Sequence, residues 1–427
     1  MRTDAPKPLA GRRLLVGVSG SIAAVKTPLL VSALVKAGAE VRCVVTPSAA
    51  KLVSPIALAS LSRHRCYQEA DGWDSTCARP LHIELAEWAE LVLLAPLSAS
   101  SLSRWSQGSA DGLLASVLLA CECPVLAAPA MNTAMWHHTA VQDNWRRIQG
   151  FPGVVPLDPA AGLLACDRQG DGRMADPQLI ELAAASLFSR GTPSPQSSRD
   201  WLGRRLLVTA GPTVESLDAA RTLTNRSSGA MGVLMAQAAQ LRGAQVDLVH
   251  GPLQVPVPWL EALRCHPIDS AAELEVVLRD LQPQADAVAM AAAVADLRRS
   301  DLDPSVKCSK SVLLEQLADG WQLVPDLLSG VTARRRAGQL VLGFAALTGD
   351  DATLRRSGEA KRRQKGCDLL FANPIDREGQ GFSAPRNGGW LLAEGHAMPL
   401  PVTSKLHLAH QLLDALKGRW PSGSTSC

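Results

Sequence analysis

Residues 203–232 read GRRLLVTAGPTVESLDAARTLTNRSSGAMG, and this stretch decides the fold of the second half of the chain. The apolar run Leu206–Val208 predicts a buried strand that stops at the AGPT turn, residues 210–213. An irregular polar segment, the loop 224–229 and a helix over residues 231–240 are expected next. A strand, a glycine turn and a helix N-terminus direct backbone N–H groups at an anion. The stretch therefore predicts a phosphate or acyl phosphate site, although an ordinary polar αβ loop fits the same pattern.

The string GRRLLV occurs twice, at residues 11–16 and 203–208. Each copy opens a predicted strand that runs into a turn of small and hydroxyl-bearing residues, GVSGSIAA in the first case and TAGPT in the second. We therefore expect two α/β domains, residues 1–187 and 201–427, joined by a Ser-, Pro- and Gly-rich linker at residues 188–200. A length of 427 residues is sufficient for two or three domains.

Composition and charge exclude several classes of protein. The net charge of +3 is spread over the chain, and its densest basic stretch, residues 355–365, fits a local anion site better than a nucleic-acid surface. No apolar run approaches the ~20 residues that span a bilayer, and the N-terminus lacks the apolar core of a signal peptide. The ten cysteines form no even framework and no CxxC pair, which indicates reduced thiols. We expect a cytoplasmic protein without nucleic-acid or membrane partners.

The first domain opens with a predicted strand, helix and strand, over residues 14–18, 22–36 and 41–46. Ser19, Gly20 and Ser21 lie at the turn after the first strand, where small residues let backbone N–H groups approach a phosphate. The turn is not GxGxxG, so it does not specifically indicate a dinucleotide. Thr46 ends the second strand at the same edge, where open α/β sheets bind their ligands.

Polar residues also follow later strands of the first half. Ser98 and Asn132 follow the predicted strands LVLLAP and VLAAP, although an asparagine there can equally be a turn or cap residue. His82 begins a helix, a place where a histidine is commonly a surface residue. Cys166 lies in the loop-like segment AAGLLACDRQGDGRM, whose charged residues cannot be buried. We therefore interpret this segment as a mobile flap that presents a proton donor.

The second half continues with further predicted strands. Residues 286–294 form an apolar, alanine-rich run that leads to Asp296, and the run GQLVLGF ends at Phe344. Lys361 and Lys365 are four residues apart, so on a helix they share one face. Alternating strands and helices again predict an α/β domain with a parallel sheet.

Nine motifs, in order along the chain, carry a resemblance to known families. In the first half SGSIAA, HIELAEWAE, PLSAS, PAMNTAMW and LACDRQGDGRM resemble the flavin-dependent phosphopantothenoylcysteine decarboxylases. In the second half TAGPTVESLDAARTLTNRSSGAMG, AAAVADL, GFAALT and KRRQKGCDLLFANP resemble phosphopantothenate–cysteine ligases. The chain thus resembles the bifunctional bacterial proteins of coenzyme A synthesis over nearly its whole length. This implies a flavodoxin-like three-layer α/β domain followed by a Rossmann-like, doubly wound ligase domain.

For the first domain the resemblance implies FMN-dependent decarboxylation. Flavin oxidation of the cysteine thiol to a thioaldehyde provides an electron sink when CO2 leaves, and the resulting enethiol is then reduced and protonated. By resemblance Cys166 supplies the proton, Asn132 binds the substrate carboxylate and His82 acts in catalysis. The residues expected at FMN and its phosphate are Ser19, Gly20, Ser21, Thr46 and Ser98.

For the second domain the resemblance implies CTP-dependent ligation. The carboxylate of 4′-phosphopantothenate attacks the α-phosphate of CTP, and the amine of cysteine then displaces CMP from the acyl cytidylate. Asn225 and Arg221 are expected at the activated acyl group, where Asn225 donates a hydrogen bond. The residues expected at the nucleotide, with Mg²⁺ on its triphosphate, are Asp296, Lys307, Pro325, Asp326, Phe344, Lys361 and Lys365.

The chain departs from the family pattern at several positions. Ala230 stands where the loop usually has lysine, Val324 replaces the asparagine of an NPD motif, and Leu347 replaces a glutamate. The lysine motif near position 307 is thinned to VKCSK, and Asp167 follows the flap cysteine in place of glycine. We expect an active ligase with altered nucleotide contacts. The alternative is a flavin-dependent decarboxylase whose ligase domain is weakened or non-catalytic.

Two other classes fit less well. A non-catalytic flavoprotein regulator would commonly lack the cysteine found at position 166, and an NAD(P) oxidoreductase would carry GxGxxG. The resemblance further implies a homo-oligomer, with flavin sites between the subunits of decarboxylase trimers and with paired ligase halves.

Overall fold

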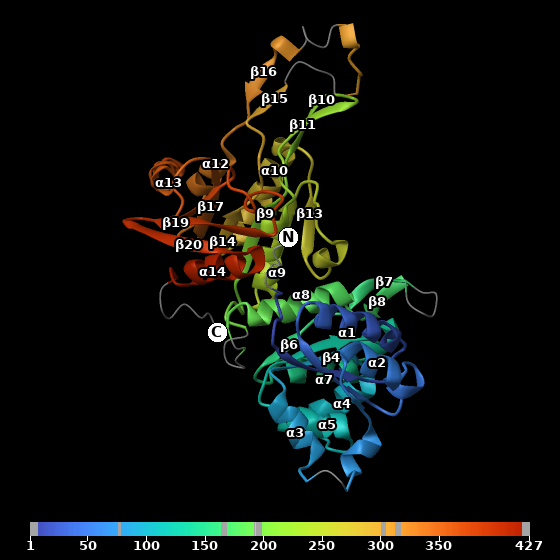
Figure 1. The fold of residues 1–427 in the computed structure, drawn as a ribbon. Helices are drawn as coiled ribbons and strands as arrows, with labels where there is room; N and C mark the ends of the chain where they lie inside the picture. The colour runs from blue at the N-terminus through green and yellow to red at the C-terminus, as the bar shows by residue number, and fades with distance from the viewer. Residues whose placement is uncertain are drawn as a thin grey trace. The chain divides into compact units, whose positions relative to one another are not determined.

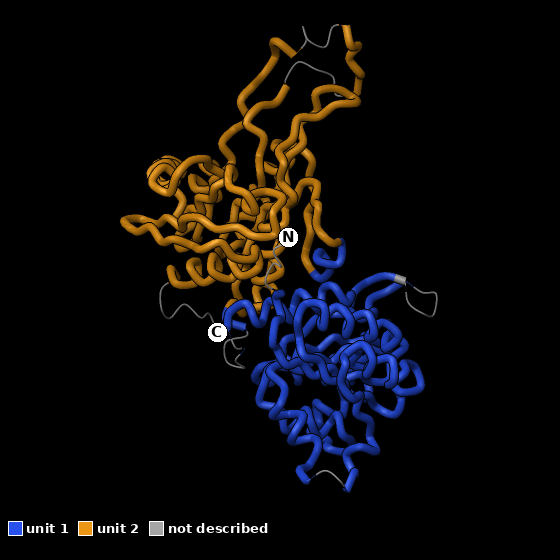
Figure 2. The backbone as a smooth tube through the Cα atoms, in the orientation of Figure 1, with its two compact units in different colours: residues 1–200, 257–262 blue, residues 201–256, 263–427 orange. Residues whose placement is uncertain are grey.

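The computed structural model describes residues 7–75, 78–163, 169–191, 193, 199–299, 305–311 and 317–420. The chain divides into two compact units, one of residues 1–200 and 257–262 and the other of residues 201–256 and 263–427 (Figure 2). None of the helices in the described part of the chain is long and apolar enough to cross a membrane. Each unit is built on its own sheet.

The sheet of the first unit has six parallel strands in the order β3-β2-β1-β4-β5-β6. The chain moves outward from β1 in one direction and from β4 in the other, so these two strands flank the topological switch point. The strands are β1 (Arg13–Val18), β2 (Glu40–Val45), β3 (Cys66–Tyr67), β4 (Leu91–Leu97), β5 (Val125–Pro129) and β6 (Val154–Pro156).

Helices cover both faces of this sheet, which confirms the three-layer α/β fold (Figure 1). One group packs together around α1: α1 (Thr27–Lys36), α2 (Pro55–Ser62) and α8 (Pro177–Phe188). The other group buries Leu85, Leu102 and Trp145 in a common core: α3 (Leu81–Trp88), α4 (Ala99–Gln107), α5 (Leu113–Ala120) and α7 (Thr139–Gln149). The single helix expected over 22–36 is divided into the 3-10 helix η1 (Ile22–Lys26) and α1, because Pro28 occupies the first turn of α1.

The segment expected to be loop-like is a β-hairpin, and that expectation was wrong. Strands β7 (Ala160–Leu163) and β8 (Gln169–Arg173) pair antiparallel. Gly172 has φ +140, and a side chain there would approach the carbonyl oxygen of Met131 to 2.3 Å. The glycines therefore let the hairpin lie against the backbone of the chain after β5. Residues 164–168, with Cys166, fall outside the described residues.

The second unit has an eight-stranded sheet in the order β13-β12-β9-β14-β17-β18-β19-β20. All neighbours pair in parallel except β18, β19 and β20, which pair antiparallel, and β9 and β14 flank the switch point. The strands are β9 (Arg205–Ala210), β12 (Gln245–His250), β13 (Arg264–Pro267), β14 (Ala287–Met290), β17 (Leu340–Leu347), β18 (Leu369–Pro374), β19 (Arg386–Ala393) and β20 (His396–Ser404).

Helices cover both faces of the second sheet as well, so the doubly wound class is confirmed (Figure 1). Helices α9 (Ala230–Leu241) and α14 (Lys405–Lys417) pack on each other. The opposite face carries α10 (Ala271–Leu281), α12 (Leu327–Ala333) and α13 (Asp351–Lys365). The core on that face contains Leu207 and Val288 from the sheet and Leu274 from α10.

Two expectations for the second half need correction. Residues 214–224 are not irregular but form the hairpin β10 (Val214–Asp218) and β11 (Arg221–Thr224), since the buried Asp218 carboxylate accepts the amides that close its turn. A second hairpin, β15 (Leu297–Arg299) and β16 (Trp321–Leu323), lies beside it (Figure 1). The strand expected over 286–294 ends at Met290. Beyond it, the amides of Ala292 and Ala295 donate to side-chain hydroxyls instead of to a neighbouring strand.

Gly232→Ala is expected to destabilise the second unit. The added Cβ would lie 2.6 Å from the Cβ of Ala210 and 2.7 Å from the carbonyl oxygen of Thr209, so α9 would have to move away from β9. Overpacking of this kind costs about 1–3 kcal/mol. Urea unfolding followed by circular dichroism measures the change. Gly418→Ala is the matched control, because the nearest atom there is 3.5 Å away; equal stability of the two variants would contradict the close contact.

Candidate active sites

A cavity of about 470 Å³ lies in the first unit, where β1, β4 and β5 end. Open α/β sheets bind ligands at this edge, next to the switch point. Its walls come from the turn after β1, the start of α4, the chain after β5 and the base of the β7–β8 hairpin. The lining residues are Gly20, Ser21, Ile22, Ala23, Val25, Lys26, Ser98, Ala99, Ser100, Ala130, Met131, Asn132, Met135, Gly172, Arg173 and Met174.

Hydroxyl groups organise one end of this cavity. The buried Ser19 hydroxyl donates to the carbonyl oxygen of Pro96 at 2.8 Å and accepts the amide of Ser98 at 2.6 Å, so it joins the ends of β1 and β4. Ser21 caps η1, and Ser98 caps α4 by accepting the amide of Ser101 at 3.3 Å. The predicted residues Gly20, Ser21 and Ser98 line the cavity, whereas Ser19 lies behind them as a structural link.

The other end of the cavity contains Asn132 and Arg173. The Asn132 side-chain oxygen accepts the amide of Ala134 at 2.8 Å and so caps α6 (Thr133–Trp136). The Arg173 guanidinium donates to the Glu261 carboxylate at 2.9 Å. Met131, Met135 and Met174 add an apolar wall, a combination that fits a flat heteroaromatic ring.

Two predicted residues of the first half lie away from this cavity. Thr46 lines a second cavity of about 200 Å³, together with Ser101 and Arg104, and its hydroxyl accepts the amide of Ala49 at 3.3 Å. His82 is the second residue of α3, half-buried, and is not among the lining residues of the larger cavity. The roles of His82 and Thr46 stay predictions, as does the role of Cys166.

In the second unit, the ends of β9 and β14 are joined by a network around Asn225. The Asn225 amide nitrogen lies 3.1 Å from the carbonyl oxygens of both Ala293 and Val294, so both of its N–H groups are directed at the backbone. The Thr224 hydroxyl donates to the Thr213 carbonyl oxygen at 2.9 Å. These bonds fix the loop 224–229 against the chain that leaves β14.

Two buried threonines complete this edge, and sequence reasoning missed them. The Thr209 hydroxyl accepts the amide of Ala292 at 3.0 Å, and the Thr213 hydroxyl accepts the amide of Ala295 at 2.9 Å. Both side chains are fully buried. Thr209 directly precedes the AGPT turn and Thr213 is its last residue, which is the signal that could have identified them.

Arg221 is held by a buried carboxylate. The Asp218 side chain pairs with the Arg221 guanidinium and accepts the amides of Ala220, Arg221 and Cys308. Burial raises the pKa of the Asp218 carboxyl, but these hydrogen bonds and the guanidinium outweigh burial and hold the pKa below its usual value. Lys307, next to Cys308, is exposed. Asp218 thus holds both the Arg221 guanidinium and the backbone next to Lys307 at the turn of the β10–β11 hairpin.

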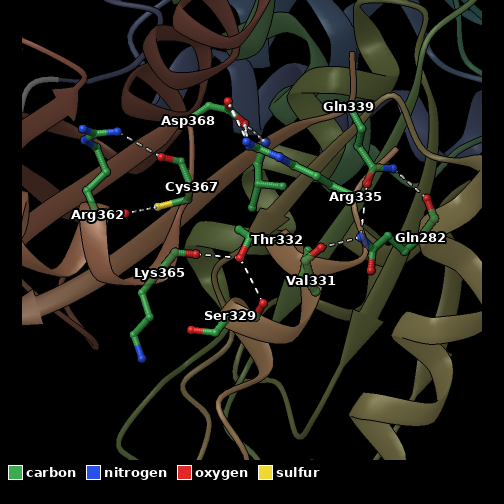
Figure 3. Close-up of polar contacts among 11 residues, drawn as sticks. Gln282, Ser329, Val331, Thr332, Arg335, Gln339, Arg362, Lys365, Cys367 and Asp368 are labelled. Carbon is green, nitrogen blue, oxygen red and sulfur yellow. Dashed lines mark hydrogen bonds and ion pairs between the residues drawn. The ribbon is translucent and has the colours of Figure 1, made fainter. Parts of the chain in front are cut away.

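Asp326 and Lys365 form an ion pair between α12 and α13. Burial raises the pKa of Asp326, but the hydrogen bonds from Lys365 and Ser329 and the charge of Lys365 outweigh burial and hold the pKa below its usual value. Figure 3 shows how the backbone of Lys365 is held: the Thr332 hydroxyl donates to the Lys365 carbonyl oxygen at 2.6 Å, and the Lys365 side chain points away from Thr332. Lys361 lies one turn earlier in α13 and is exposed, so the expected helix is confirmed.

The contacts of three other residues predicted at the nucleotide, Asp296, Pro325 and Phe344, are as follows. The carbonyl oxygen of Asp296 accepts the amide of Val324 at 2.9 Å, which joins the roots of the β15–β16 hairpin, and Pro325 follows there exposed. Phe344 packs edge-to-face on Phe371, with ring centroids 5.8 Å apart. Asp296 is bonded to the hairpin root, and Lys365 is paired with Asp326. In the described part of the chain, no hydrogen bond, ion pair or ring contact joins Phe344, Lys307 or Lys361 to Asn225.

Comparison with known proteins identifies the chain's relatives. Residues 2–187 match the family model "Flavoprotein", and residues 201–419 match "DNA/pantothenate metabolism flavoprotein C-terminal domain". The coenzyme A biosynthesis bifunctional protein CoaBC of Bacillus subtilis is 34% identical over 96% of this chain and 97% of its own length. The CoaBC of Mycobacterium tuberculosis is 38% identical over 95% and 96%, respectively.

Solved structures resemble the two halves separately. The FMN binding protein AtHal3 covers 42% of this chain and 97% of its own, with 33% identity and a TM-score of 0.39. The C-terminal domain of a CoaBC protein covers 52% of this chain and 97% of its own, with 26% identity and a TM-score of 0.41.

Asp218→Asn is expected to loosen the β10–β11 hairpin at neutral pH, because the amide cannot pair with Arg221 as a charge. The pKa of Asp218 is lower in the folded protein than in the unfolded one. Its stabilisation is therefore present above about pH 4 and lost as the pH falls through the folded-state pKa. Melting temperatures should differ at pH 7 and converge in acid. Asp319→Asn, at an exposed site, is the control; a wild-type melting temperature for Asp218→Asn at pH 7 would contradict the ion pair.

Proposed function

The chain belongs to the family of bifunctional coenzyme A biosynthesis proteins, and we propose that its two units divide the two reactions between them. It is a phosphopantothenate–cysteine ligase and a phosphopantothenoylcysteine decarboxylase. We assign the decarboxylase to residues 1–187 and the ligase to residues 201–427, with residues 188–200 as the linker. The cavity at the β1–β4 switch point supports the assignment of the decarboxylase to residues 1–187, because it lies in the half that matches the flavoprotein model. A cytoplasmic location is supported by the free thiols of the described cysteines.

The first cavity suits FMN. Ser21 and the backbone around Gly20 can hold a phosphate, while the wall formed by Met131, Met135 and Met174 matches an apolar ring. When bound, FMN would oxidise the cysteine thiol of the substrate to a thioaldehyde and later return a hydride.

The chain's own groups then bind and protonate the substrate. The Asn132 oxygen caps α6, so a substrate carboxylate would bind through the Asn132 amide nitrogen. The base of the β7–β8 hairpin lines the cavity, so the hairpin is placed to exclude water. Cys166, in the segment between β7 and β8, would protonate the enethiol formed after CO2 leaves.

The cavity is best completed by a neighbouring subunit. Ile22 and Val25 line it, yet 57% and 54% of these apolar side chains is exposed, and Leu29 on the same face is 67% exposed. Exposed apolar side chains that gather in this way indicate a contact surface. We therefore propose trimeric decarboxylase halves, in which His82 reaches the flavin site of a neighbouring copy. Thr46, whose amide donates to the Val18 carbonyl oxygen at 3.0 Å, would line the flavin at the end of β1. Paired ligase halves are the corresponding proposal for the second unit.

In the ligase reaction Asn225 and Arg221 would act on the activated acyl group. The Asn225 amide can donate to an oxyanion only by releasing the carbonyl of Ala293 or Val294, so we propose that substrate binding exchanges one of these bonds. Arg221 is aligned by Asp218, which costs no reorganisation during the reaction. Asp296, Phe344, Pro325 and Asp326 would contact the nucleotide.

CTP and Mg²⁺ are proposed to enter this site together. No three His, Cys, Asp or Glu side chains converge as a metal site in the described parts of the chain. Mg²⁺ commonly binds to substrate phosphates with only one or two protein carboxylates, so this donor set fits a metal carried by the triphosphate. Lys307, Lys361 and Lys365 would balance the phosphate charge, and Lys365 would then exchange its pairing with Asp326.

Cys166→Ser is expected to retain bound, yellow flavin while the enethiol accumulates, because the serine hydroxyl is a far weaker acid than the thiol. Loss of a positioned proton donor slows product formation about 10²-fold or more. Mass spectrometry of the reaction mixture measures both species. Cys265→Ser in the second unit is the matched control, and formation of 4′-phosphopantetheine by Cys166→Ser at the parent rate would refute the proton-donor role.

Asn225→Asp is expected to stop amide formation at the activated acid and to leave decarboxylation intact. A carboxylate at this position cannot donate to an oxyanion, and it would face the carbonyl oxygens of Ala293 and Val294. The loss of such a donor lowers the rate about 10²-fold. Amide formation is followed from phosphopantothenate, cysteine and CTP, and CO2 release from supplied phosphopantothenoylcysteine. If both reactions fell together, the division of labour between the units would be wrong.

A further inference from the structure

Lys405, the first residue of α14, is a buried cation with one side-chain hydrogen bond in the described structure. Only 4% of its surface is exposed, and its Nζ atom donates to the carbonyl oxygen of Phe382 at 2.9 Å. The backbone amide of Lys405 donates to the carbonyl oxygen of Pro385 at 3.1 Å. Two bonds from this one residue therefore fix the segment between β18 and β19.

The same Phe382 carbonyl holds the loop that carries Asn225. It accepts a second hydrogen bond, from the Ser228 hydroxyl at 3.1 Å. Ser228 is buried in the loop 224–229, and its hydroxyl also accepts the amide of Ala230, the first residue of α9, at 3.4 Å. One carbonyl thus connects Lys405 to the loop beside the start of α9.

The loop has little room to adjust without this connection. Gly229 caps α9 with φ +74, and a side chain there would lie 2.2 Å from Leu253 and 3.1 Å from the amide of Gly211. The Asn225 amide is bonded at the other end of the loop to Ala293 and Val294. A shift of Ser228 would therefore be transmitted to Asn225, because the loop between them is anchored on both sides.

We propose that Lys405 is a positioning residue for the ligase reaction, which through the Phe382 carbonyl and Ser228 sets the place of the loop 224–229 and of Asn225. This inference rests on the proposed ligase function of the second unit. Lys405 does not contact the reacting groups; it acts only through Phe382 and Ser228.

Stability alone does not account for a lysine at this position. Burial lowers the pKa of Lys405 to about 8, which means that the fold disfavours its charged form. A methionine would fill the same space without a buried charge, and exchanges of this kind are often neutral or stabilising. A residue kept for structure would be replaceable at no cost to activity, whereas a positioning residue would not.

The test compares full-length Lys405→Met, Lys405→Arg and Ser228→Ala with Lys417→Met, which removes an exposed lysine from the other end of α14. Pyrophosphate release from phosphopantothenate, cysteine and CTP measures the ligase, and CO2 release from supplied phosphopantothenoylcysteine measures the decarboxylase. Hydrogen exchange over residues 224–234 and melting temperatures are recorded for each variant.

Lys405→Met and Ser228→Ala should each lower the ligase kcat about tenfold or more with little change in KM, since a small misplacement of a reacting group has effects of this size. A chain that carries both Lys405→Met and Ser228→Ala should lose no more ligase activity than the worse of the two single variants, because both substitutions act on the same connection. Exchange over residues 224–234 should be faster, the melting temperature of Lys405→Met should be equal or higher, and CO2 release should be unchanged. Lys405→Arg keeps a donor and should recover most of the ligase rate, and Lys417→Met should match the wild type.

An unchanged ligase kcat in Lys405→Met would overturn the proposal. A lower melting temperature together with equal losses of both activities would also overturn it, since it would show a purely structural role. If the wild-type chain releases no pyrophosphate, the ligase function itself fails. Hydrogen exchange then still decides the inference, and wild-type exchange over residues 224–234 in Lys405→Met would refute it.

Discussion

Both sites depend on how the backbone is satisfied where parallel strands end. Beyond the last strand pair, amide and carbonyl groups have no neighbouring strand, and buried ones must find other partners. In the first unit the Ser19 hydroxyl joins the Pro96 carbonyl and the Ser98 amide. In the second, the Thr209 and Thr213 hydroxyls accept amides of the chain that leaves β14. Because short side chains replace the missing strand, the backbone can turn away and leave room for a ligand.

The same requirement explains the position of Asn225. Its amide binds two consecutive carbonyls after β14, so the residue expected to act in catalysis also closes the sheet edge. Structural and chemical roles therefore compete for the same two N–H groups. In the proposed ligase reaction this competition would couple substrate binding to the loop 224–229, and the bonds that hold the other end of this loop would then influence the ligase.

The sequence predicted the parts of the fold that depend on local apolar patterns. The repeated GRRLLV strings open β1 and β9, and Lys361 and Lys365 lie on one helix as their spacing indicated. The hairpin β7–β8 was missed because its strands are short, polar and glycine-containing. The hairpin β10–β11 was missed because its strands are short and its turn is closed by the buried Asp218 side chain.

Contacts between distant residues could not be predicted either. The pair of Asp326 with Lys365 and the shared Phe382 carbonyl join segments that only the folded sheet brings together. Their residue types carry no local signal, since an isolated lysine is ordinarily a solvated surface residue.

One chain carries both a ligase and a decarboxylase, and we place a nucleotide site and a flavin site on two separate sheet edges. The most direct measurement follows pyrophosphate and CO2 together from one preparation given 4′-phosphopantothenate, cysteine and CTP. We expect the two products to appear in equal final amounts and omission of CTP to abolish both. Release of CO2 from supplied phosphopantothenoylcysteine, without any pyrophosphate from the complete mixture, would contradict this expectation.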